Sequence, residues 1–339
     1  MRAFRWGPGG AREDNSGSIF ILVVWTLFIL ASLGLVLRSD VRARVSLAEH
    51  LKQKASSYYL AKAGIDRTRK LIAQDPPSST QALKQWWNRD KDTFDEVHLP
   101  GGYYSVFKSD PENAKDIGLI DEERKININR VPIEVLRRVF EMGARVSSEQ
   151  AEAIAESIMD WRDPNDYPME NGAESDYYKS LEHPYKAKNK DFQMLDELLL
   201  VKGVSPDIYE RVKNYLTVYG KGTVNINTAG TVVLTSLGLT EDLAERIIKY
   251  RNGDDRKEGT DDDRTFDQAD QIPEVLTLDR VIDQDGVTQL QRVLTSNWLG
   301  THSDNFSGVC QGIARGAAGL TRVDFVISRD QTIWFWRQE

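Results

Sequence analysis

Residues 18–37 read SIFILVVWTLFILASLGLVL, a run of twenty residues without a charge. At a rise of about 1.5 Å per residue, a helix of this length covers about 30 Å, the thickness of the hydrocarbon core of a bilayer. The sequence has no second run of this kind, so it predicts a single membrane-spanning segment. Arg2, Arg5 and Arg12 precede the run and favour a cytoplasmic N-terminus, an indication that two neighbouring acidic residues weaken.

The residues on either side of the run separate three interpretations. A secretory signal peptide needs a shorter apolar core followed by a small-residue cleavage site, whereas Arg38, Ser39 and Asp40 follow here directly. A plain membrane anchor stays open as the simplest alternative. The third interpretation starts from Gly17, which stands immediately before the run, and from a long helix that continues beyond it.

The continuing helix is predicted to run from Arg38 to about Ala73. Its apolar side chains recur at steps of three, four or seven, as on one face of an amphipathic helix. They are Val41, Val45, Ala48, Leu51, Ala55, Tyr58 and Ile65. Pro76 and Pro77 end the helix. With the apolar run, the prediction is one helix of roughly 55 residues, on the order of 80 Å long.

Composition limits the function. The chain has 339 residues, of which 40% are apolar and 28% charged, so it is predicted to hold about two folded domains. Its formal net charge of −8 disfavours a chain-wide nucleic-acid surface. The single cysteine, Cys310, excludes an intrachain disulfide and a CxxC metal cluster. The four histidines lie outside H-E-x-x-H spacing, and no G-x-S-x-G or Walker motif occurs, so no catalytic residue is predicted.

Strand-like segments lie on both sides of a long helical segment. Residues 101–109 and 118–128 are the first of them, the second around the turn acids Asp121 and Glu122. The others are 306–313, 321–328 and 332–336. A Trp-rich stretch before the first strand is predicted as a short helix and loop. The economical arrangement is one β-sheet with a helical insertion over residues 127–295.

The insertion contains two similar units. ININ at 126–129 and VNIN at 224–227 each precede a helix, and their asparagines are predicted to cap it. The units resemble helix-hairpin-helix DNA-binding repeats, in which a hairpin presents backbone N–H groups to phosphate. The hairpins at 202–204 and 237–240 hold a single glycine each, and acidic residues that repel phosphate follow them. DNA binding therefore stays only as an alternative.

An acidic loop is the strongest candidate for a chemical site. Residues 160–178 read DWRDPNDYPMENGAESDYY, with prolines and a glycine that keep the stretch in a loop. Its acidic residues are Asp160, Asp163, Asp166, Glu170, Glu174 and Asp176. Oxygen ligands without histidine or thiol suit Ca²⁺, although a solvated acidic loop is the alternative. A second acidic stretch, 252–271, could hold another ion, but the basic residues that interrupt it favour a flexible solvated loop.

The N-terminus resembles that of type IV pilin-like proteins, because Gly17 is followed by SIFILVVWTLFILASLGL. The resemblance implies that a prepilin peptidase cleaves between Gly17 and Ser18 and methylates Ser18. Most members carry Glu at the fifth mature position, whereas this chain has Leu22. That departure resembles one branch, the minor pseudopilin K of type II secretion systems. A minor pilin of a type IV pilus, for which Glu at position 22 would be expected, is the alternative.

The acidic loop adds to the resemblance. Its D-W-x-D and G-A-E-x-x-Y-Y strings are similar to a signature in the helical domain of pseudopilin K, which binds calcium in that family. The resemblance thus implies structural Ca²⁺. The predicted ligands are Asp160, Asp163, Asp166 and Glu174.

The resemblance implies an α+β fold: a long pilin-like N-terminal helix and an antiparallel sheet with a large inserted helix-hairpin-helix (SAM-like) domain. The predicted parts are a leader at 1–17, the helix at 18–75, a first pilin-like part at 76–126, the insertion at 127–295 and the final strands at 296–339. The implied function is structural, at the tip of a periplasmic pseudopilus for protein export. The implied partners are pseudopilins I and J, with H as a further candidate, the inner-membrane assembly platform and the prepilin peptidase, and no nucleic acid. The implied location is the inner membrane, crossed once, with the C-terminal part in the periplasm.

Overall fold

The computed structural model describes residues 16–76, 80–108, 116–316 and 319–339, which form two compact units, 1–55 and 56–339. Helix α1, Ser16–Gln74, supplies all of the described part of the first unit and continues into the second. The single long helix predicted from the sequence is therefore confirmed. Gly17 and Ser18 lie in its first turn, and the rest of the predicted leader, residues 1–15, lies outside the described residues.

The first part of α1 is long and apolar enough to cross a membrane. Its large side chains are exposed along the whole predicted span, from Ile19 to Leu37, and Leu22 is among them with 64% of its surface exposed. A helix that exposes apolar side chains on all sides is typical of a segment that lipid or other helices cover.

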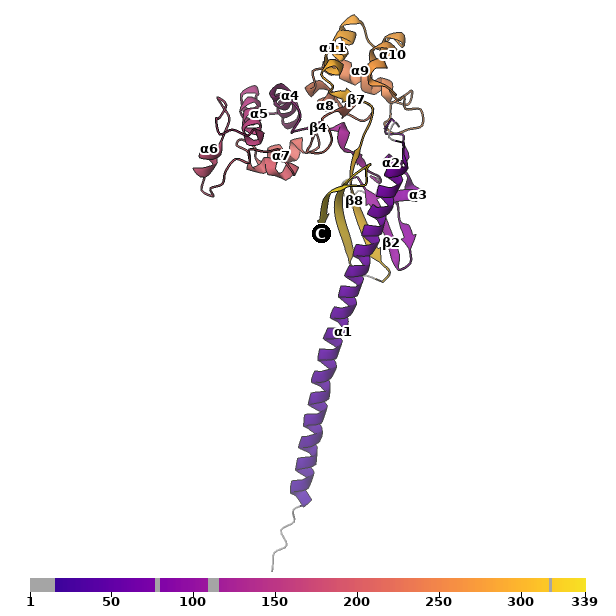
Figure 1. Ribbon diagram of the computed structural model, residues 1–339. Coiled ribbons are helices and arrows are strands. Elements are labelled where there is room, and N and C mark those ends of the chain that lie inside the picture. Colours follow the sequence, from indigo (N-terminus) through magenta and orange to yellow (C-terminus); the bar gives the residue numbers. More distant parts are fainter. Residues whose placement is uncertain (1–15, 77–79, 109–115, 317–318) are drawn as a thin grey trace, which may run out of the picture. The chain divides into compact units, whose positions relative to one another are not determined.

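The second unit contains one antiparallel sheet (Figure 1). Its strands follow the order β1-β2-β8-β9-β10, with β3 also paired to β8. They are β1 Val97–Leu99, β2 Gly102–Phe107, β3 Ile120–Asp121, β8 Asn305–Ala314, β9 Leu320–Ser328 and β10 Ile333–Gln338. Since β2 pairs directly with β8, the long segment between them is an insertion into one sheet, as predicted.

The second part of α1 packs against this sheet and buries Ala61, Ile65 and Ile72 in a common core. The approach is close. A Cβ added at Gly312 on β8 would lie 2.1 Å from the Ser57 carbonyl oxygen, so only glycine fits there.

Short elements lie between α1 and the insertion, as the Trp-rich stretch predicts: α2, Trp86–Arg89, and α3, Lys91–Phe94. The strand predicted at 118–128 is divided into three pieces. β3 joins the main sheet, the 3-10 helix η1 (Glu122–Arg124) follows, and β4 (Ile126–Asn127) belongs to the insertion. The division falls at Asp121, Glu122 and Glu123, and all three of these side chains are buried.

These three consecutive acidic residues connect the sheet to the insertion. Asp121 accepts hydrogen bonds from Asn225, Thr228 and Ser303, all of which are far from it in the sequence. Glu122 accepts from Thr217 and Ser307, and Glu123 accepts twice from Asn305. Burial raises the pKa of Asp121, and burial together with the Asp121 charge raises that of Glu123 well above its ordinary value.

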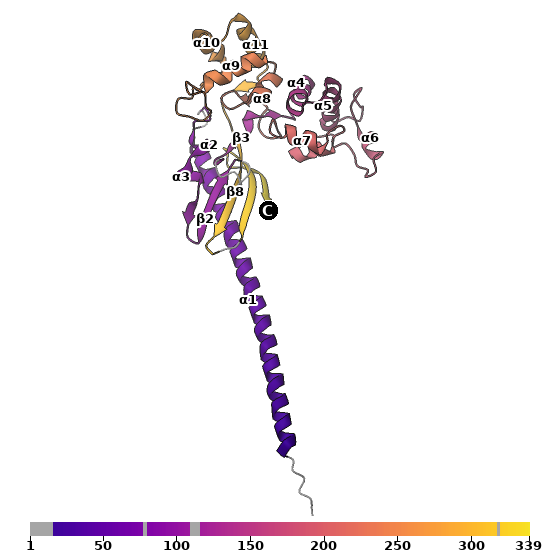
Figure 2. The ribbon, with the colours of Figure 1, turned by 180° about the vertical axis from the view of Figure 1, so that it is seen from behind.

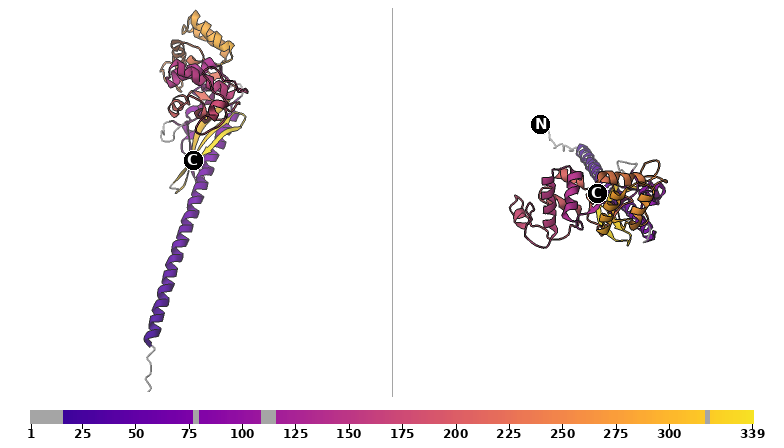
Figure 3. Two further views of the ribbon diagram at one scale, coloured as in Figure 1. Left: turned by 90° about the vertical axis from the view of Figure 1, so that its left-hand side faces the viewer. Right: turned by 90° about the horizontal axis from the view of Figure 1, so that it is seen from above.

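The insertion has its own core, formed by helices that gather into two groups (Figure 2). The first comprises α4 Ile133–Val139, the π-helix η2 Phe140–Ala144, α5 Ser148–Arg162, α6 Ser175–Lys179, the 3-10 helix η3 Leu195–Leu200 and α7 Pro206–Val212. The second comprises α8 Thr231–Ser236, α9 Glu241–Arg251, η4 Ala269–Gln271, α10 Ile272–Leu278 and α11 Gln284–Thr295. Both groups can be followed in Figure 3.

Each group is closed by a short pair of parallel strands. β4 pairs with β5 (Leu216–Thr217), and β6 (Val224–Asn225) pairs with β7 (Leu299–Gly300). The groups are therefore two copies of one motif, the first and second repeats below, and the second extends to Gly300, beyond the predicted end of the insertion at 295. Hairpin residues Gly203 and Gly238 have φ of +85° and +114°, conformations that favour glycine.

The prediction that the asparagines cap helices is wrong. The N-cap residues of α4 and α8 are Pro132 and Gly230, neither of which caps through a side chain. Instead, Asn129 exchanges two hydrogen bonds with the backbone of Phe192, at 2.8 and 2.9 Å. Asn227 does the same with Phe266, at 2.8 and 3.0 Å. Each asparagine thus ties a segment that is distant in the sequence to the turn before the first helix of its repeat.

In each repeat an arginine binds the same turn, from the last position of α5 in the first repeat and of α9 in the second. Arg162 donates to the carbonyl groups of Ile128 and Val131, and Arg251 donates to those of Ile226 and Ala229. Arg162 and Arg251 therefore mark equivalent positions, from which α5 and α9 can be aligned.

Candidate metal centre

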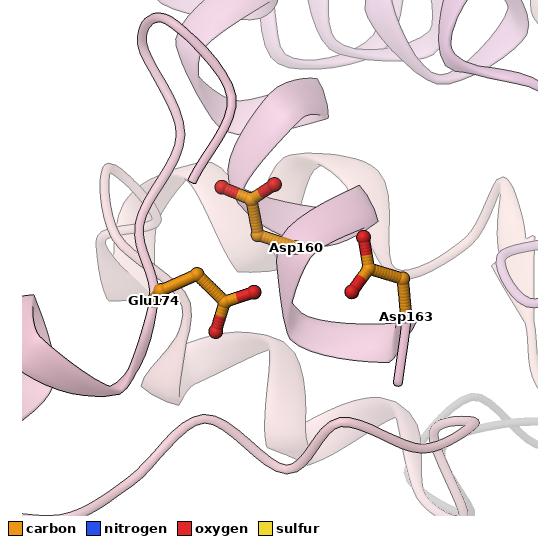
Figure 4. A group of neighbouring side chains, drawn as sticks. All are labelled: Asp160, Asp163 and Glu174. Carbon is orange, nitrogen blue, oxygen red and sulfur yellow. The ribbon is translucent and has the colours of Figure 1, made fainter. Parts of the chain in front are cut away.

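Three of the predicted ligands meet at the end of α5. Asp160 lies in its last turn, Asp163 is its C-cap and Glu174 is the N-cap of α6. One carboxylate oxygen from each lies within 4.8 Å of the others, and the side chains face a common space (Figure 4). Among the residues that the structure describes, no other group of three His, Cys, Asp or Glu side chains meets this distance.

Asp160 is the most enclosed member, with no exposed surface. Its carboxylate accepts the backbone N–H of Met169 at 3.1 Å, and its pKa is raised by burial. The loop passes so close that a Cβ added at Gly172 would lie 1.9 Å from Asp160 Oδ2. The glycine of the G-A-E string is therefore required because Asp160 occupies the space of a side chain.

Glu174 carries the clearest sign of a missing partner. Only 3% of its surface is exposed, yet neither Oε1 nor Oε2 has a hydrogen-bond partner. Burial and the charge of Asp160 raise its pKa from 4.5 to about 7. A buried carboxylate without a donor is costly, and a cation among the three carboxylates would supply what Glu174 lacks.

Asp166, the fourth predicted ligand, is not part of this group. Its Oδ1 accepts hydrogen bonds from Ser175 at 3.0 Å and Asn189 at 3.2 Å. It holds the loop against α6 from the side. Asp163 is half-buried, and one of its oxygens accepts the backbone N–H of Asn165.

Two residues outside the sequence prediction support the loop. Glu156, one turn before Asp160 on α5, accepts hydrogen bonds from the backbone and side chain of Asn171. Lys202 Nζ donates to the carbonyl groups of Asn171 and Gly172 at 3.0 and 2.9 Å. The spacing of Glu156 and Asp160 on one helix face is the signal that could have identified Glu156.

Aromatic residues of the D-W-x-D and G-A-E-x-x-Y-Y strings pack beneath the acidic loop. Trp161 meets Tyr178 edge to face at 5.2 Å between ring centroids, and Tyr178 stacks on Tyr185 at 5.1 Å. Both Trp161 and Tyr178 are buried. They hold the end of α5 and the start of α6 together, which keeps Asp160 and Glu174 close.

The residues present fit a hard divalent cation. The donor set consists of carboxylate oxygens alone, and two of these oxygens have no hydrogen-bond partner. The three carboxylates, at a helix end and in a loop, lie close enough together to bind one ion. Ca²⁺ accepts six to eight such oxygens at about 2.3–2.6 Å.

The second acidic stretch is built differently. Asp262 accepts the backbone N–H groups of Asp254 and Asp255, and Asp263 accepts that of Gly259. Hydrogen bonds, first from Thr260, lower the pKa of Asp262 to about 2. These carboxylates thus already have hydrogen-bond donors within the loop.

Comparisons with known proteins place these features in one family. A family profile described as "Type II secretion system (T2SS), protein K" matches residues 119–221, which span the first repeat with its metal centre. Proteins named type II secretion system protein K are similar along most of the chain. That of Pectobacterium carotovorum is 25% identical over 64% of this chain and 66% of its own length, and that of Pseudomonas aeruginosa is 25% identical over 70% and 72%. A putative protein K of Escherichia coli K12 is 30% identical over 63% and 66%.

A solved structure shares the fold. It is described as the GspK–GspI–GspJ complex from the type 2 secretion system of enterotoxigenic Escherichia coli. One chain of it matches with a TM-score of 0.59 and 18% identity, covering 88% of this chain and 99% of its own length. The predicted α+β fold, a long helix and an antiparallel sheet with an inserted helical domain, is confirmed by this match. The chain belongs to the type II secretion system protein K family.

Proposed function

We propose that this chain is a minor pseudopilin that caps the tip of a periplasmic pseudopilus and starts its assembly for protein export across the outer membrane. The observation that carries the proposal is Leu22 in α1, at the position where most pilin-like subunits have glutamate. The work of such a subunit is structural, and no catalysis is proposed.

The argument rests on the charge at the start of a processed subunit. Cleavage before Ser18 would leave an amino group on α1, next to the apolar surface of neighbouring helices. A charge left unpaired in such surroundings costs several kcal/mol, so shaft subunits need a carboxylate nearby. Leu22 cannot provide one. A terminal subunit has no neighbour above it that needs this carboxylate, so only there is Leu22 without cost.

The insertion supports the same position. Residues between β3 and β8 form two helical repeats with a core of their own, in addition to the sheet core. A subunit with this added mass would hinder another from stacking above it. A random position along the shaft would explain neither the inserted helical repeats nor the leucine at position 22.

The proposed location follows from α1. Its apolar part would cross the inner membrane before assembly, with the remainder of the chain in the periplasm. The prepilin peptidase would cleave between Gly17 and Ser18 and methylate Ser18 at the membrane, and the assembly platform would then extract the subunit.

The proposed cofactor is one structural Ca²⁺ at the metal centre, held by Asp160, Asp163 and Glu174. The ion would neutralise mutually repelling carboxylates and fix the loop between α5 and α6. Support comes from the two unpartnered oxygens of Glu174 and from the purely carboxylate donor set.

The proposed partners are pseudopilins I and J, because the structural match comes from a complex of GspK, GspI and GspJ. Co-expression with affinity-tagged chain, detergent extraction and purification should recover I and J together in a fixed ratio. The major pseudopilin, tagged in the same way, serves as the control and should not recover a stoichiometric I–J pair. Recovery of DNA in place of I and J would favour the helix-hairpin-helix receptor and contradict the proposal.

A further inference from the structure

The second repeat has a basic hollow of about 410 Å³ beside α9. Five cationic side chains line it, together with Tyr250, Gly253, Asp254 and Val281. They are Arg246, Lys249, Arg256, Arg264 and Arg280. The chain as a whole has a formal net charge of −8, so this local concentration of positive charge is opposite in sign to the whole chain.

Two of the five cations are paired and three are not. Arg246 binds Asp242, and Arg264 binds Asp254 while lying 4.8 Å over the ring of Tyr250. Within the described ranges, the side chains of the other three have no ion-pair or hydrogen-bond partner. They are Lys249, Arg256 and Arg280, and all three are exposed.

Arg246 adds an independent sign that an acceptor belongs here. Its Nε is buried and has no hydrogen-bond partner, although Nη1 donates to the Val281 carbonyl group. A buried guanidinium N–H without an acceptor is unfavourable in the same way as the orphaned carboxylate of Glu174. An anion in the hollow would serve this donor and the three unpaired cations together.

The two repeats show how the charge was reversed. Aligning Arg251 with Arg162 places Lys249 at the position of Asp160, Arg246 at that of Ser157 and Asn252 at that of Asp163. The end of α5 therefore presents carboxylates, whereas the equivalent end of α9 presents an ammonium and a guanidinium. One motif thus offers a cation site in its first copy and an anion site in its second.

We propose that the hollow binds carboxylates of an acidic segment of a partner protein. Guanidinium groups match carboxylates in planar, two-pronged geometry, and Tyr250 and Val281 add a less polar wall for the segment. The lining also includes Asp254, and Asp242 and Asp279 bond to its residues. This mixture of charges suits spaced carboxylates better than the continuous phosphates of a nucleic acid or the plane of a lipid surface.

The test measures binding of a fluorescein-labelled hexaglutamate peptide to the full-length chain in zwitterionic detergent, by fluorescence anisotropy. The test variant combines Lys249→Glu, Arg256→Glu and Arg280→Glu. The control combines Lys54→Glu, Arg292→Glu and Arg315→Glu, which changes the net charge equally at exposed cations outside the hollow. Far-UV circular dichroism should show the same melting curve for both, since all six side chains are exposed.

We expect the test variant to bind the peptide at least about tenfold more weakly than the natural chain and the control to stay within about twofold of it. Affinity for the natural chain should also fall with added salt. Equal affinities of test variant and natural chain, or equal losses in both variants, would overturn the proposal. The proposal would also be overturned if the natural chain bound a dT6 oligonucleotide or anionic vesicles more tightly than the peptide and the test variant lost that tighter binding.

Discussion

Chelating divalent cations should lower the melting temperature of the full-length protein by about 5–10 °C. A cation at about 100 times its Kd stabilises the folded state by about 2.7 kcal/mol, and about 1 kcal/mol shifts the melting temperature of a domain of 150–250 residues by about 2–4 °C. The loss should concentrate in the first repeat, because Asp160, Asp163 and Glu174 then repel one another in a buried site. Differential scanning calorimetry with Ca²⁺ and with chelator measures it.

Two variants separate the metal centre from the loop around it. Glu174→Gln removes the orphaned charge, so its melting temperature should hardly respond to chelator and, without ion, should equal or exceed that of the natural chain. Gly172→Ala should also abolish the response, because its Cβ would lie 1.9 Å from Asp160 Oδ2. Glu170→Gln makes the same chemical change on an exposed residue of the same loop and should respond like the natural chain. An identical melting curve of the natural chain with and without chelator would exclude a structural ion.

The ion-free protein should also respond to pH. The pKa of Glu174 in the folded protein is about 7, above its ordinary value of 4.5, so the folded state binds this proton more tightly than the unfolded state. Its stabilising contribution is fully present below pH 4.5 and is lost as the pH rises through 7. With Ca²⁺ bound, Glu174 stays ionised and this loss should disappear, whereas Glu174→Gln should lack it in both conditions.

Gly17→Glu should leave the whole precursor uncut. A peptidase acting at the membrane face must accommodate the residue before the cut, and glutamate introduces both bulk and charge beside the apolar run that begins at Ser18. The unprocessed chain would stay in the membrane and complexes with I and J would not reach the filament. Intact mass spectrometry should find N-methylated Ser18 at the start of the natural chain and Met1 at the start of the variant.

Gly10→Glu makes the same substitution within the predicted leader and should be processed normally. A mature N-terminus at any residue other than Ser18, or normal processing of Gly17→Glu, would contradict the proposed cleavage.

Features encoded by neighbouring residues were predictable from the sequence. The apolar run and the amphipathic stretch specify α1 through local periodicity, and alternation along 321–328 specifies β9. Three of the four ligands predicted in the acidic loop lie close together in the structure. They do so because the loop connects the end of α5 to the start of α6, where these residues are placed.

Features that depend on distant partners were not predictable. Asn129 was expected to cap the next helix, yet its side chain exchanges hydrogen bonds with the backbone of Phe192, 63 residues away in the sequence. Asp121 was expected only as a turn residue within a strand region, yet it is buried and bonded to partners from both the insertion and the loop before β8. The residue type alone does not tell whether an Asn or Asp side chain bonds to a neighbouring residue or to one distant in the sequence.

The most direct test of the proposed tip position is to label one cysteine variant of this chain, in a cysteine-free background, and locate it on isolated pseudopili. Cys310 is buried, so Cys310→Ser supplies that background, and Ser180→Cys on the exposed end of α6 supplies the labelling site. Gold-maleimide labelling and electron microscopy should find one particle per filament, at the end distal to the inner membrane. Particles repeated along the shaft would contradict the account.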